Sequence, residues 1–264
     1  MSSDSFSSTI HERAALGFDR AAGEYERGRP GYPAAAIDLL ASELALGPGT
    51  TVVDLAAGTG KLTRALIPTG ARVIAVEPVA GMREQLVGAV PAAEVLAGTA
   101  EAIPLADGNA DAVLVAQAFH WFNTPVAARE IHRVLRPGGG LGVIWNVWDD
   151  TVDWVGRMQQ LIGAYRGDTP QRATSGWREQ LIATALFTPL SDRTLPNVVS
   201  GSLEDVLLAR TASISFIATL PEAERGKLLD DVRALVIAEH PEGWAQDGLT
   251  MPYVTHVTWC HATR

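Results

Sequence analysis

The sequence contains a single cysteine, Cys260, and no run of basic residues. One cysteine cannot form a disulfide within the chain, so nothing in the sequence calls for an oxidising compartment. Lys and Arg total 21 against 30 Asp and Glu, which gives a net charge of -9. An acidic balance of this kind opposes binding to a nucleic-acid backbone or to an anionic membrane surface. We therefore expect neither nucleic acid nor a membrane as a partner.

Long apolar runs and clustered metal ligands are also absent. No stretch approaches the roughly 20 apolar residues of a membrane-spanning helix, and the opening residues MSSDSFSST lack the pattern of a signal peptide. The six histidines are dispersed. In THVTWCHATR, strand alternation puts His256 and Cys260 on one face and His261 on the other, which favours a structural role over a metal site. We expect a cytoplasmic protein without a bound metal.

Short apolar runs alternate with helical segments between residues 51 and 146. The runs read TVVDLA, RVIAVE, AEVLAG, DAVLVAQA and GLGVIWN. They are apolar throughout rather than alternating, which is expected of strands covered by helices on both faces. The intervening segments include GKLTRALIPTG, VAGMREQLVGAV and PVAAREIHRVLRPGG, and PAAAIDLLASELALGPG precedes the first strand as an amphipathic helix. The pattern predicts a doubly wound, Rossmann-like α/β sheet.

The pattern changes after Asn146. Residues 153–186 and 203–238 look helical, FTPLSDRTLPNVVSG separates them, and MPYVTHVTWCHAT has the composition of a strand. We expect one domain over residues 1–264, divided into an N-terminal cap segment (1–34), a ligand-binding core (35–146) and late helices with the last two strands (147–264). Trp145 and Trp148 follow a strand end, where open α/β sheets bind ligands, so they either pack the core or line a substrate site.

The segment VVDLAAGTGKLT, residues 52–63, joins the first strand to the next helix through a glycine-rich turn. A dinucleotide site needs G-x-G-x-x-G/A, but Thr63 stands at the third position after Gly58 and Gly60, and a register starting at Ala56 puts Lys61 there. A phosphate-binding P-loop also fails, because GTGKLT lacks the required four-residue gap. Neither nucleotide motif is therefore satisfied.

Two strand-ending acids point to a different ligand. Asp54 would repel a pyrophosphate, but it suits S-adenosylmethionine (SAM), whose ammonium and sulfonium groups are positive. Glycines let the backbone approach the methionyl part, and free amides at the start of the next helix can receive its carboxylate. Glu77 ends the second strand, where a carboxylate can accept both ribose hydroxyls. A strand-ending acid also serves NAD enzymes, so Glu77 indicates a ribose rather than one cofactor.

Eight ordered segments carry a resemblance that covers nearly the whole chain. They are FDRAAGEYERGRPGYP, VVDLAAGTGKLT, AVEPVAGM, GTAEAIPLADGNADAV, AQAFHWF, RVLRPGG, IWN and MPYVTHVTW. With these segments the chain resembles the class I SAM-dependent methyltransferases, within them the methyltransferase type 11 group and relatives of trans-aconitate methyltransferase. The resemblance implies a seven-stranded sheet in the order 3-2-1-4-5-7-6, with the last strand antiparallel and formed by about residues 251–261.

The resemblance also implies the residues of a SAM site. Asp54, Ala56, Gly58 and Gly60 would shape the methionyl side, and Glu77 would bind the ribose. Pro78, Met82, Thr99, Ala100 and Glu101 would contact the adenine, and Gln117 and Ala118 would close the site at the end of the fourth strand. Tyr25 and Arg29 would fold over the cofactor. The acceptor site would be lined by Tyr32, Trp121, Trp145 and Trp148. Many relatives carry Asp at the position of Thr99, so either the Thr99 hydroxyl or Glu101 would accept the adenine amino group.

His120, in AQAFHWF after the fourth strand, is the candidate base or acceptor-orienting residue. It is the one histidine expected at the ligand edge of the sheet, although it would equally well be wedged between Phe119 and Trp121. The fourth strand lacks the Asn/Asp-Pro-Pro-aromatic sequence that is typical of methyltransferases acting on amino groups of nucleic acids. We therefore expect a small-molecule acceptor, with S-adenosylhomocysteine (SAH) as the second product. The alternatives are a non-catalytic SAM-binding protein and an NAD-dependent oxidoreductase.

Overall fold

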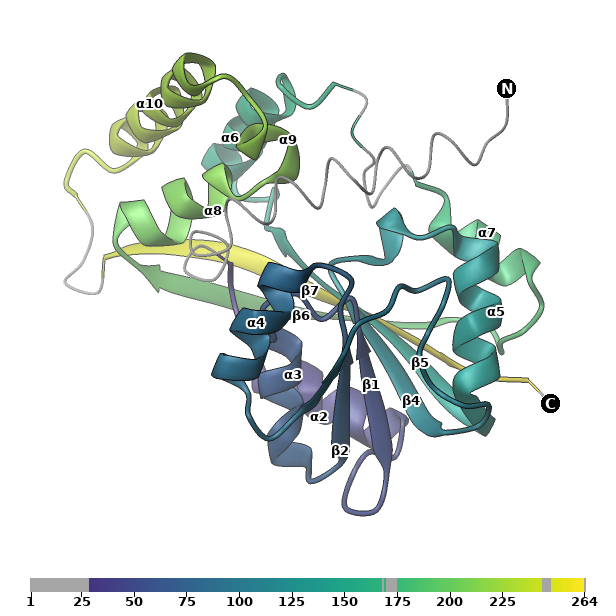
Figure 1. Ribbon diagram of the computed structural model, residues 1–264. Helices are drawn as coiled ribbons and strands as arrows, with labels where there is room; N and C mark the ends of the chain where they lie inside the picture. Colours follow the sequence, from purple (N-terminus) through teal and green to yellow (C-terminus); the bar gives the residue numbers. More distant parts are fainter. Residues whose placement is uncertain (1–28, 168, 170–174, 244–247, 264) are drawn as a thin grey trace, which may run out of the picture. The chain divides into compact units, whose positions relative to one another are not determined.

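A computed structural model describes residues 29–167, 169, 175–243 and 248–263 (Figure 1). The chain divides into two compact units. We call them the helical unit (Met1–Pro30, Asn146–Thr169 and Pro196–Val254) and the core unit (Gly31–Trp145, Pro170–Leu195 and Thr255–Arg264). Each unit is assembled from three separate segments of the chain. The expectation of one domain over residues 1–264, in which late helices cover the acceptor, stays a prediction.

The parallel strands of the sheet follow the apolar runs of the sequence. They are β1 (Thr51–Leu55), β2 (Arg72–Val76), β3 (Glu94–Leu96), β4 (Ala110–Ala116) and β5 (Leu135–Trp148). β1 pairs with β2 on one side and with β4 on the other, and β2–β3 and β4–β5 complete the parallel set (Figure 1). Almost every residue of β1, β2 and β4 is buried, as expected for strands covered on both faces.

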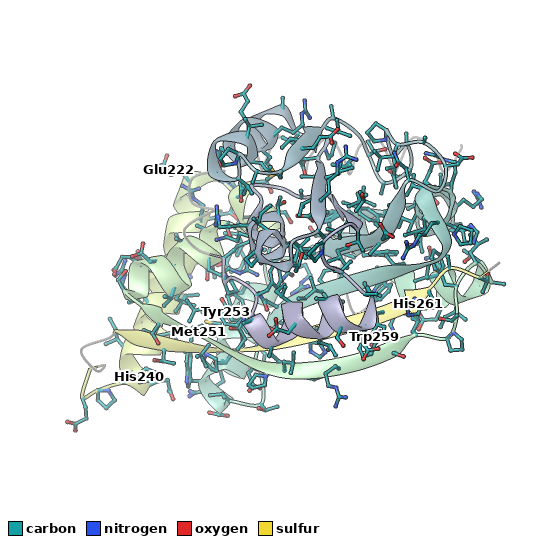
Figure 2. All side chains as sticks on the ribbon, turned by 90° about the horizontal axis from the view of Figure 1, so that it is seen from below. Glu222, His240, Met251, Tyr253, Trp259 and His261 are labelled. Atoms are coloured by element: carbon teal, nitrogen blue, oxygen red, sulfur yellow. The ribbon has the colours of Figure 1, made fainter. Side chains whose placement is uncertain are left out.

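Two further strands complete a seven-stranded sheet in the order β3-β2-β1-β4-β5-β7-β6. They are β6 (Ser191–Gly201) and β7 (Leu249–His261), and β7 runs antiparallel to the others. The predicted strand order and the position of the last strand are confirmed. Figure 2 shows Met251 and Tyr253 in the first half of β7, and Trp259 and His261 in the second half. The side chains of Met251, Tyr253 and Trp259 are buried.

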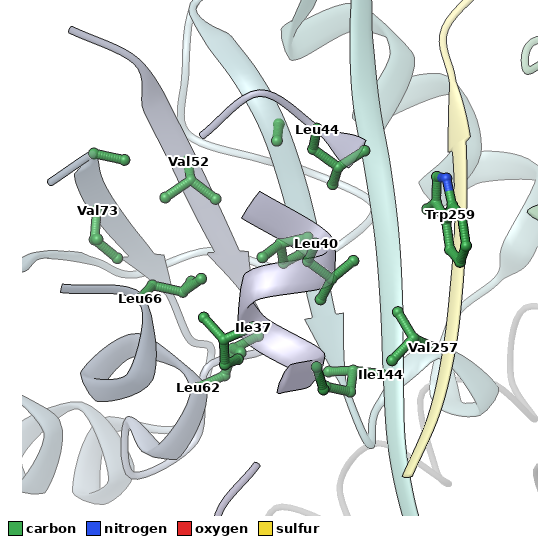
Figure 3. Packing of buried hydrophobic residues seen from close by; sticks show 14 residues of the cluster. Ile37, Leu40, Leu44, Val52, Leu62, Leu66, Val73, Ile144, Val257 and Trp259 are labelled. Carbon is green, nitrogen blue, oxygen red and sulfur yellow. The ribbon is translucent and has the colours of Figure 1, made fainter. Parts of the chain in front are cut away.

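The helices of the core unit place its hydrophobic core. They are α2 (Ala34–Glu43), α3 (Lys61–Leu66) with the 3-10 turn η1 (Ile67–Thr69), α4 (Ala80–Ala89), the 3-10 turn η2 (Phe119–Trp121), α5 (Thr124–Val134) and α7 (Trp177–Ala183). Ile37 and Leu40 of α2 pack with Leu62 of α3 against Val52 of β1 (Figure 3). α2 also lies close to β5, and Gly142 of β5 leaves room for Leu40, because a Cβ atom at Gly142 would lie 2.8 Å from Leu40 Cδ2.

The helical unit has its own core. Its helices are α6 (Asp153–Gly163), the π-helical turn η3 (Glu204–Leu208), α8 (Ala209–Ala212), α9 (Ser215–Ala218) and α10 (Glu222–Glu239). Leu228, Val232 and Val236 recur every four residues on α10, so they share a face, and all three belong to one buried cluster with Met158 of α6. Within the part of the chain that the structure describes, no helix has both the length and the apolar character needed to cross a bilayer.

Three details differ from the sequence-based expectations. The helix expected to run through Gly139 ends at Val134, since β5 begins at Leu135. The expected helices over 153–186 and 203–238 are broken into shorter ones, and Pro221 immediately precedes α10. The segment expected to separate them contains β6, a strand at one edge of the sheet with mostly exposed side chains in its first half. Most of the expected N-terminal cap segment (1–34) lies outside the described residues, which begin at residue 29.

Candidate cofactor site

The carboxyl ends of β1, β2 and β4 meet at one edge of the sheet (Figure 1). Asp54 is the penultimate residue of β1, Glu77 directly follows β2 and Gln117 directly follows β4. Asp54 lies beside Ala75 of β2 and Leu114 of β4 in the register of the sheet. The parallel pairing therefore brings together at one edge two acids and a polar amide that are far apart in the sequence, and open α/β sheets bind ligands at this edge.

The glycine-rich turn after β1 has an unusual backbone. Ala56, Gly58 and Gly60 have φ angles of 59°, 58° and 89°, in the left-handed region. Glycine adopts this conformation freely, whereas an L-residue such as Ala56 pays about 1–2 kcal/mol. The N–H groups of Ala56 and Ala57 hold the turn in place by donating to the carbonyl of Val76, at 2.8 and 3.2 Å. Strained alanine at a strand end is typical of a functional site.

Gly60 is required at its position both by conformation and by space. A Cβ atom there would lie 3.0 Å from Leu86 Cγ, on top of the strain of a φ of 89°. We expect Gly60→Ala to lower the free energy of unfolding by about 1–3 kcal/mol, measured by urea denaturation. Gly88→Ala is the matched control, because Gly88 is helical with no atom in its way, and it should stabilise by about 0.5–1 kcal/mol. Equal stabilities of the two variants would contradict this account.

Glu77 fastens the turn to the end of β2. Its side chain is buried, and its two carboxylate oxygens accept hydrogen bonds from the N–H groups of Gly58 and Val79, each at 2.9 Å. Burial raises the pKa of Glu77, while these two N–H groups and Arg83 act in the opposite direction. Arg83 also donates to the carbonyls of Glu77 and Pro78. Each carboxylate oxygen has a second lone pair, so Glu77 can still accept hydroxyl groups of a ligand.

Asp54 is fully buried and only half satisfied. Its Oδ2 accepts a 2.6 Å hydrogen bond from the Thr63 hydroxyl of α3, while its Oδ1 has no hydrogen-bond partner among the described residues. Burial raises the pKa of Asp54 from 3.8 to about 7; hydrogen bonding by Thr63 lowers it and the charge of Glu77 raises it further. A buried carboxylate oxygen without a donor is costly. The arrangement therefore fits a ligand that brings a positive group or an N–H donor to Asp54.

The loop between β3 and β4 carries the predicted adenine contacts. Thr99 is exposed and pairs with Ala102 through a short β-bridge, and Ala100 between them is buried. Glu101 Oε1 accepts a 2.9 Å hydrogen bond from the N–H of Asn123, the residue that caps α5. One carboxylate oxygen of Glu101 is thus already hydrogen-bonded within the protein, whereas the Thr99 side chain is exposed to solvent. The remaining predicted contacts of this group lie after β2, with Pro78 exposed and Met82 buried in α4.

A group of aromatic side chains follows the end of β4. Gln117 adopts a left-handed φ of 60°, and η2 then carries His120 and Trp121. The His120 ring lies 4.7 Å from the Trp121 ring and 5.3 Å from the Trp145 ring, measured between centroids. Trp145 is buried, while His120 and Trp121 are half-buried, as is Ala118. The structure therefore brings three of the predicted acceptor-site residues together within the core unit.

The other predicted site residues are distributed differently. Tyr32 packs against the main cluster of the core unit. Arg29 and Trp148 belong to the helical unit, where Arg29 donates to the carbonyl of Ser213 at 3.4 Å and Trp148 Nε1 donates to Tyr253 at 2.9 Å. Their roles toward cofactor and acceptor stay predictions. Tyr25 lies outside the described residues.

Two residues of this site were missed from the sequence. In the sequence Thr63 only breaks the dinucleotide motif, but in the structure its hydroxyl donates a hydrogen bond to Asp54. Arg83 lies one helical turn into α4 and donates to the carbonyls of Glu77 and Pro78. The position of Thr63, in the first turn of the helix that follows the glycines, was the available signal for its role.

Comparison with known proteins identifies the family. The model of the family described as "Methyltransferase domain" matches residues 53–143. An uncharacterized methyltransferase of Mycobacterium tuberculosis is 42% identical over 247 residues, covering 91% of this chain and 93% of its own. The chain belongs to the class I SAM-dependent methyltransferases. An uncharacterized methyltransferase-like protein of Schizosaccharomyces pombe is 38% identical to this methyltransferase, over 79% of this chain and 82% of its own.

The solved structures agree on the fold of this methyltransferase. A putative type II methyltransferase from Anaeromyxobacter dehalogenans superposes with a TM-score of 0.63 at 20% identity, over 89% of this chain and 97% of that chain. At this identity the likeness concerns the fold alone. Membership in the family implies a SAM-type cofactor and a methyl acceptor, and it leaves no support for an NAD-dependent oxidoreductase.

Proposed function

We propose that this methyltransferase binds SAM at the carboxyl edge of its sheet and transfers the methyl group to a small-molecule acceptor. The observation that carries the proposal is Asp54 Oδ1, a fully buried carboxylate oxygen to which no described residue donates, next to the glycine turn that Glu77 fastens. In the proposal Asp54 faces the positive methionyl end and Glu77 the ribose hydroxyls. Ala56, Gly58 and Gly60 shape the turn between them. Other residues complete the cofactor contacts: Tyr25, Arg29, Pro78, Met82, Thr99, Ala100, Glu101, Gln117 and Ala118.

Charge and motif content support a small acceptor. The net charge of -9 disfavours nucleic acid, and the fourth strand ends in AQAFHWF without an Asn/Asp-Pro-Pro-aromatic sequence. In the proposal Tyr32, Trp121, Trp145 and Trp148 contact the acceptor. The lone Cys260 is buried, and burial raises the pKa of its thiol to about 12, so it stays protonated and unreactive. This thiol is consistent with the cytoplasm, to which we assign the protein.

Methyl transfer from SAM depends chiefly on how the acceptor is positioned relative to the methyl group. Bound SAM supplies a methyl group on a sulfonium leaving group. The protein holds the acceptor atom in line with that methyl, and alignment of this kind contributes roughly 7–11 kcal/mol toward a barrier. In the proposal the rings of Trp121 and Trp145 beside His120 line the acceptor side. Where the acceptor atom carries a proton, the His120 imidazole would receive it, and Trp121 and Trp145 would fix the orientation of the ring.

His120→Ala tests the assignment of the base. We expect an unchanged dissociation constant for SAH and a turnover reduced about 100-fold or more, since a positioned base contributes roughly that factor or above. Turnover is measured with labelled SAM and the acceptor found in the screen below. The control is His132→Ala, because His132 on α5 contacts the carbonyl of Thr263 and the Phe187 ring. A reduction of less than threefold at intact SAH affinity would remove His120 as the base.

Calorimetric titration with SAM, SAH and NAD tests the cofactor. We expect SAM and SAH to bind and NAD to give no heat; tight NAD binding without a response to SAM would overturn the proposal. Incubation with labelled SAM and a metabolite extract then tests turnover. A labelled small molecule is the expected product, and label that enters only protein or nucleic acid would contradict the small acceptor. SAM binding without any methylated product would favour a non-catalytic SAM-binding protein.

A further inference from the structure

Arg133, in the last turn of α5, donates three hydrogen bonds to the loop between β3 and β4 and two to Glu130 of its own helix. Nη1 donates to the carbonyl of Leu105 and to Asp107, each at 2.8 Å, and Nη2 donates to the carbonyl of Ile103 at 3.0 Å. Nε and Nη2 each donate to one oxygen of Glu130, at 2.9 and 2.8 Å. These five bonds match the five N–H groups of a guanidinium. Lysine, with three donors on one atom, cannot reproduce this fork.

Glu130 completes the attachment. While one of its oxygens receives Arg133 Nε, the other also accepts the N–H of Ile103 at 3.1 Å. The N–H of Gly108 donates to the Arg133 carbonyl at 2.9 Å, so backbone as well as side chains join the loop to the helix. An isolated surface ion pair spaced i,i+3 contributes little to stability. Here both members of the pair also bind backbone groups of the loop between β3 and β4, so the pair connects that loop to α5.

The same helix holds the loop a second time at its other end. The N–H of Asn123, the cap of α5, donates to Glu101, as described above. Just before the predicted adenine contacts the loop packs closely against itself, because a Cβ atom at Gly98 would lie 2.5 Å from Pro104 Cδ. The predicted adenine contacts, residues 99–101, thus lie at the start of a loop that α5 holds at Glu101 and again between Ile103 and Gly108.

We propose that Arg133, together with Glu130, is a positioning residue for base recognition: it holds the loop so that Thr99, Ala100 and Glu101 meet the adenine edge. This inference rests on the proposed SAM site. A loop that is fixed before the ligand arrives costs less to order on binding, so affinity and discrimination both improve. Loss of the fork leaves the loop free to adopt other positions, and the contact with the adenine amino group is then the first to be lost.

The test measures base discrimination in the full chain by titrating SAH and S-inosyl-L-homocysteine, in which a carbonyl oxygen replaces the amino group of the base. We expect the native protein to bind SAH about tenfold more tightly than the inosyl compound. In Arg133→Met that preference should fall to about threefold or less, with SAH affinity reduced about tenfold. Arg129→Met is the control, since Arg129 is an exposed residue of the same helix, and it should keep the native preference.

A purely structural role for Arg133 predicts a different result, namely a lower melting temperature with the preference unchanged, and that result would overturn the inference. So would a native protein that binds both compounds equally. Glu130→Gln serves as the second variant where Arg133→Met does not fold: it keeps an acceptor for Arg133 but removes the charge, and its preference should fall by about twofold or more. If the native protein binds neither compound, the proposed function itself fails, whereas native discrimination that survives in both variants defeats only the inference.

Discussion

Glu77→Ala should weaken SAM binding at least tenfold. In the proposed site each charge-assisted hydrogen bond from the ribose to Glu77 is worth about 1.5–3 kcal/mol, and 1.4 kcal/mol already corresponds to a factor of ten. The variant also releases the N–H groups of Gly58 and Val79 that the carboxylate now binds. The glycine turn would therefore lose its attachment to β2 at the same time as the ribose loses its acceptor.

Calorimetry of three variants separates these two effects. Glu84→Ala is the control, because Glu84 is exposed on α4 and should leave the affinity unchanged. Glu77→Gln keeps the shape of the side chain but only one accepting oxygen for the N–H groups of Gly58 and Val79, so it should loosen the turn less than Glu77→Ala while still removing the charge that would bind the ribose. SAM affinity of Glu77→Ala within threefold of the Glu84→Ala value would refute the ribose assignment.

Asp54→Asn should remove most SAM binding and its dependence on pH. With a pKa of about 7, Asp54 is half protonated near neutrality. A cationic ligand requires the ionised form, so native affinity should rise about tenfold between pH 6 and pH 8 and level off above. At pH 8 the variant should bind SAM about 10- to 100-fold more weakly, the value of one hydrogen bond to a buried charge. Asp38→Asn, an exposed site on α2, is the control. A pH-independent native affinity would contradict the role of Asp54.

The same shift predicts how stability without ligand depends on pH. The folded-state pKa of Asp54, about 7, lies above its ordinary value of 3.8, so the folded state holds its proton over that range while the unfolded state loses it. Stability therefore falls as the pH rises from about 4 to about 7 and is constant above. Between pH 5 and pH 7 this carboxyl costs on the order of 3 kcal/mol. Urea unfolding should show that loss in the native protein and a clearly smaller one in Asp54→Asn, in which only the raised pKa of Glu77 acts in the same direction.

The core unit was predictable where sequence pattern and burial agree. β1, β2 and β4 are continuous apolar runs because both faces of each strand are covered, and no other local structure suits them as well. The position of β6 in the sequence was not predictable for the opposite reason, although the family resemblance implied a seventh strand. Its sequence, SDRTLPNVVSG, has charges and a proline, which suit an exposed edge strand but also suit a loop. Its place in the sheet depends on β7, so no local signal reveals it; the strand order itself came from the family resemblance.

For the candidate site, the sequence predicts where Asp54 and Glu77 lie in the fold but not which groups they bind within the protein. The turn motif and the strand ends pointed to Asp54 and Glu77, and both lie where parallel strands must place them. Which groups those acids bind in the protein was not predictable. Glu77 reaches back 19 residues to Gly58, and the N–H of Asn123 reaches Glu101 across 22 residues. Such pairs form only after helices and loops have packed, and spacing along the chain does not encode them.

The way the core unit is assembled has a consequence for synthesis in the cell. Val257 and Trp259 of β7 belong to the same buried cluster as Ile37 and Leu40 of α2, although more than 200 positions separate them. The ribosome therefore delivers the last part of this cluster long after the first. Until residues 255–263 have left the exit tunnel, the nascent core unit exposes the apolar surface that Val257 and Trp259 later bury. Folding of the core unit is thus expected to finish only after residues 255–263 have emerged from the ribosome.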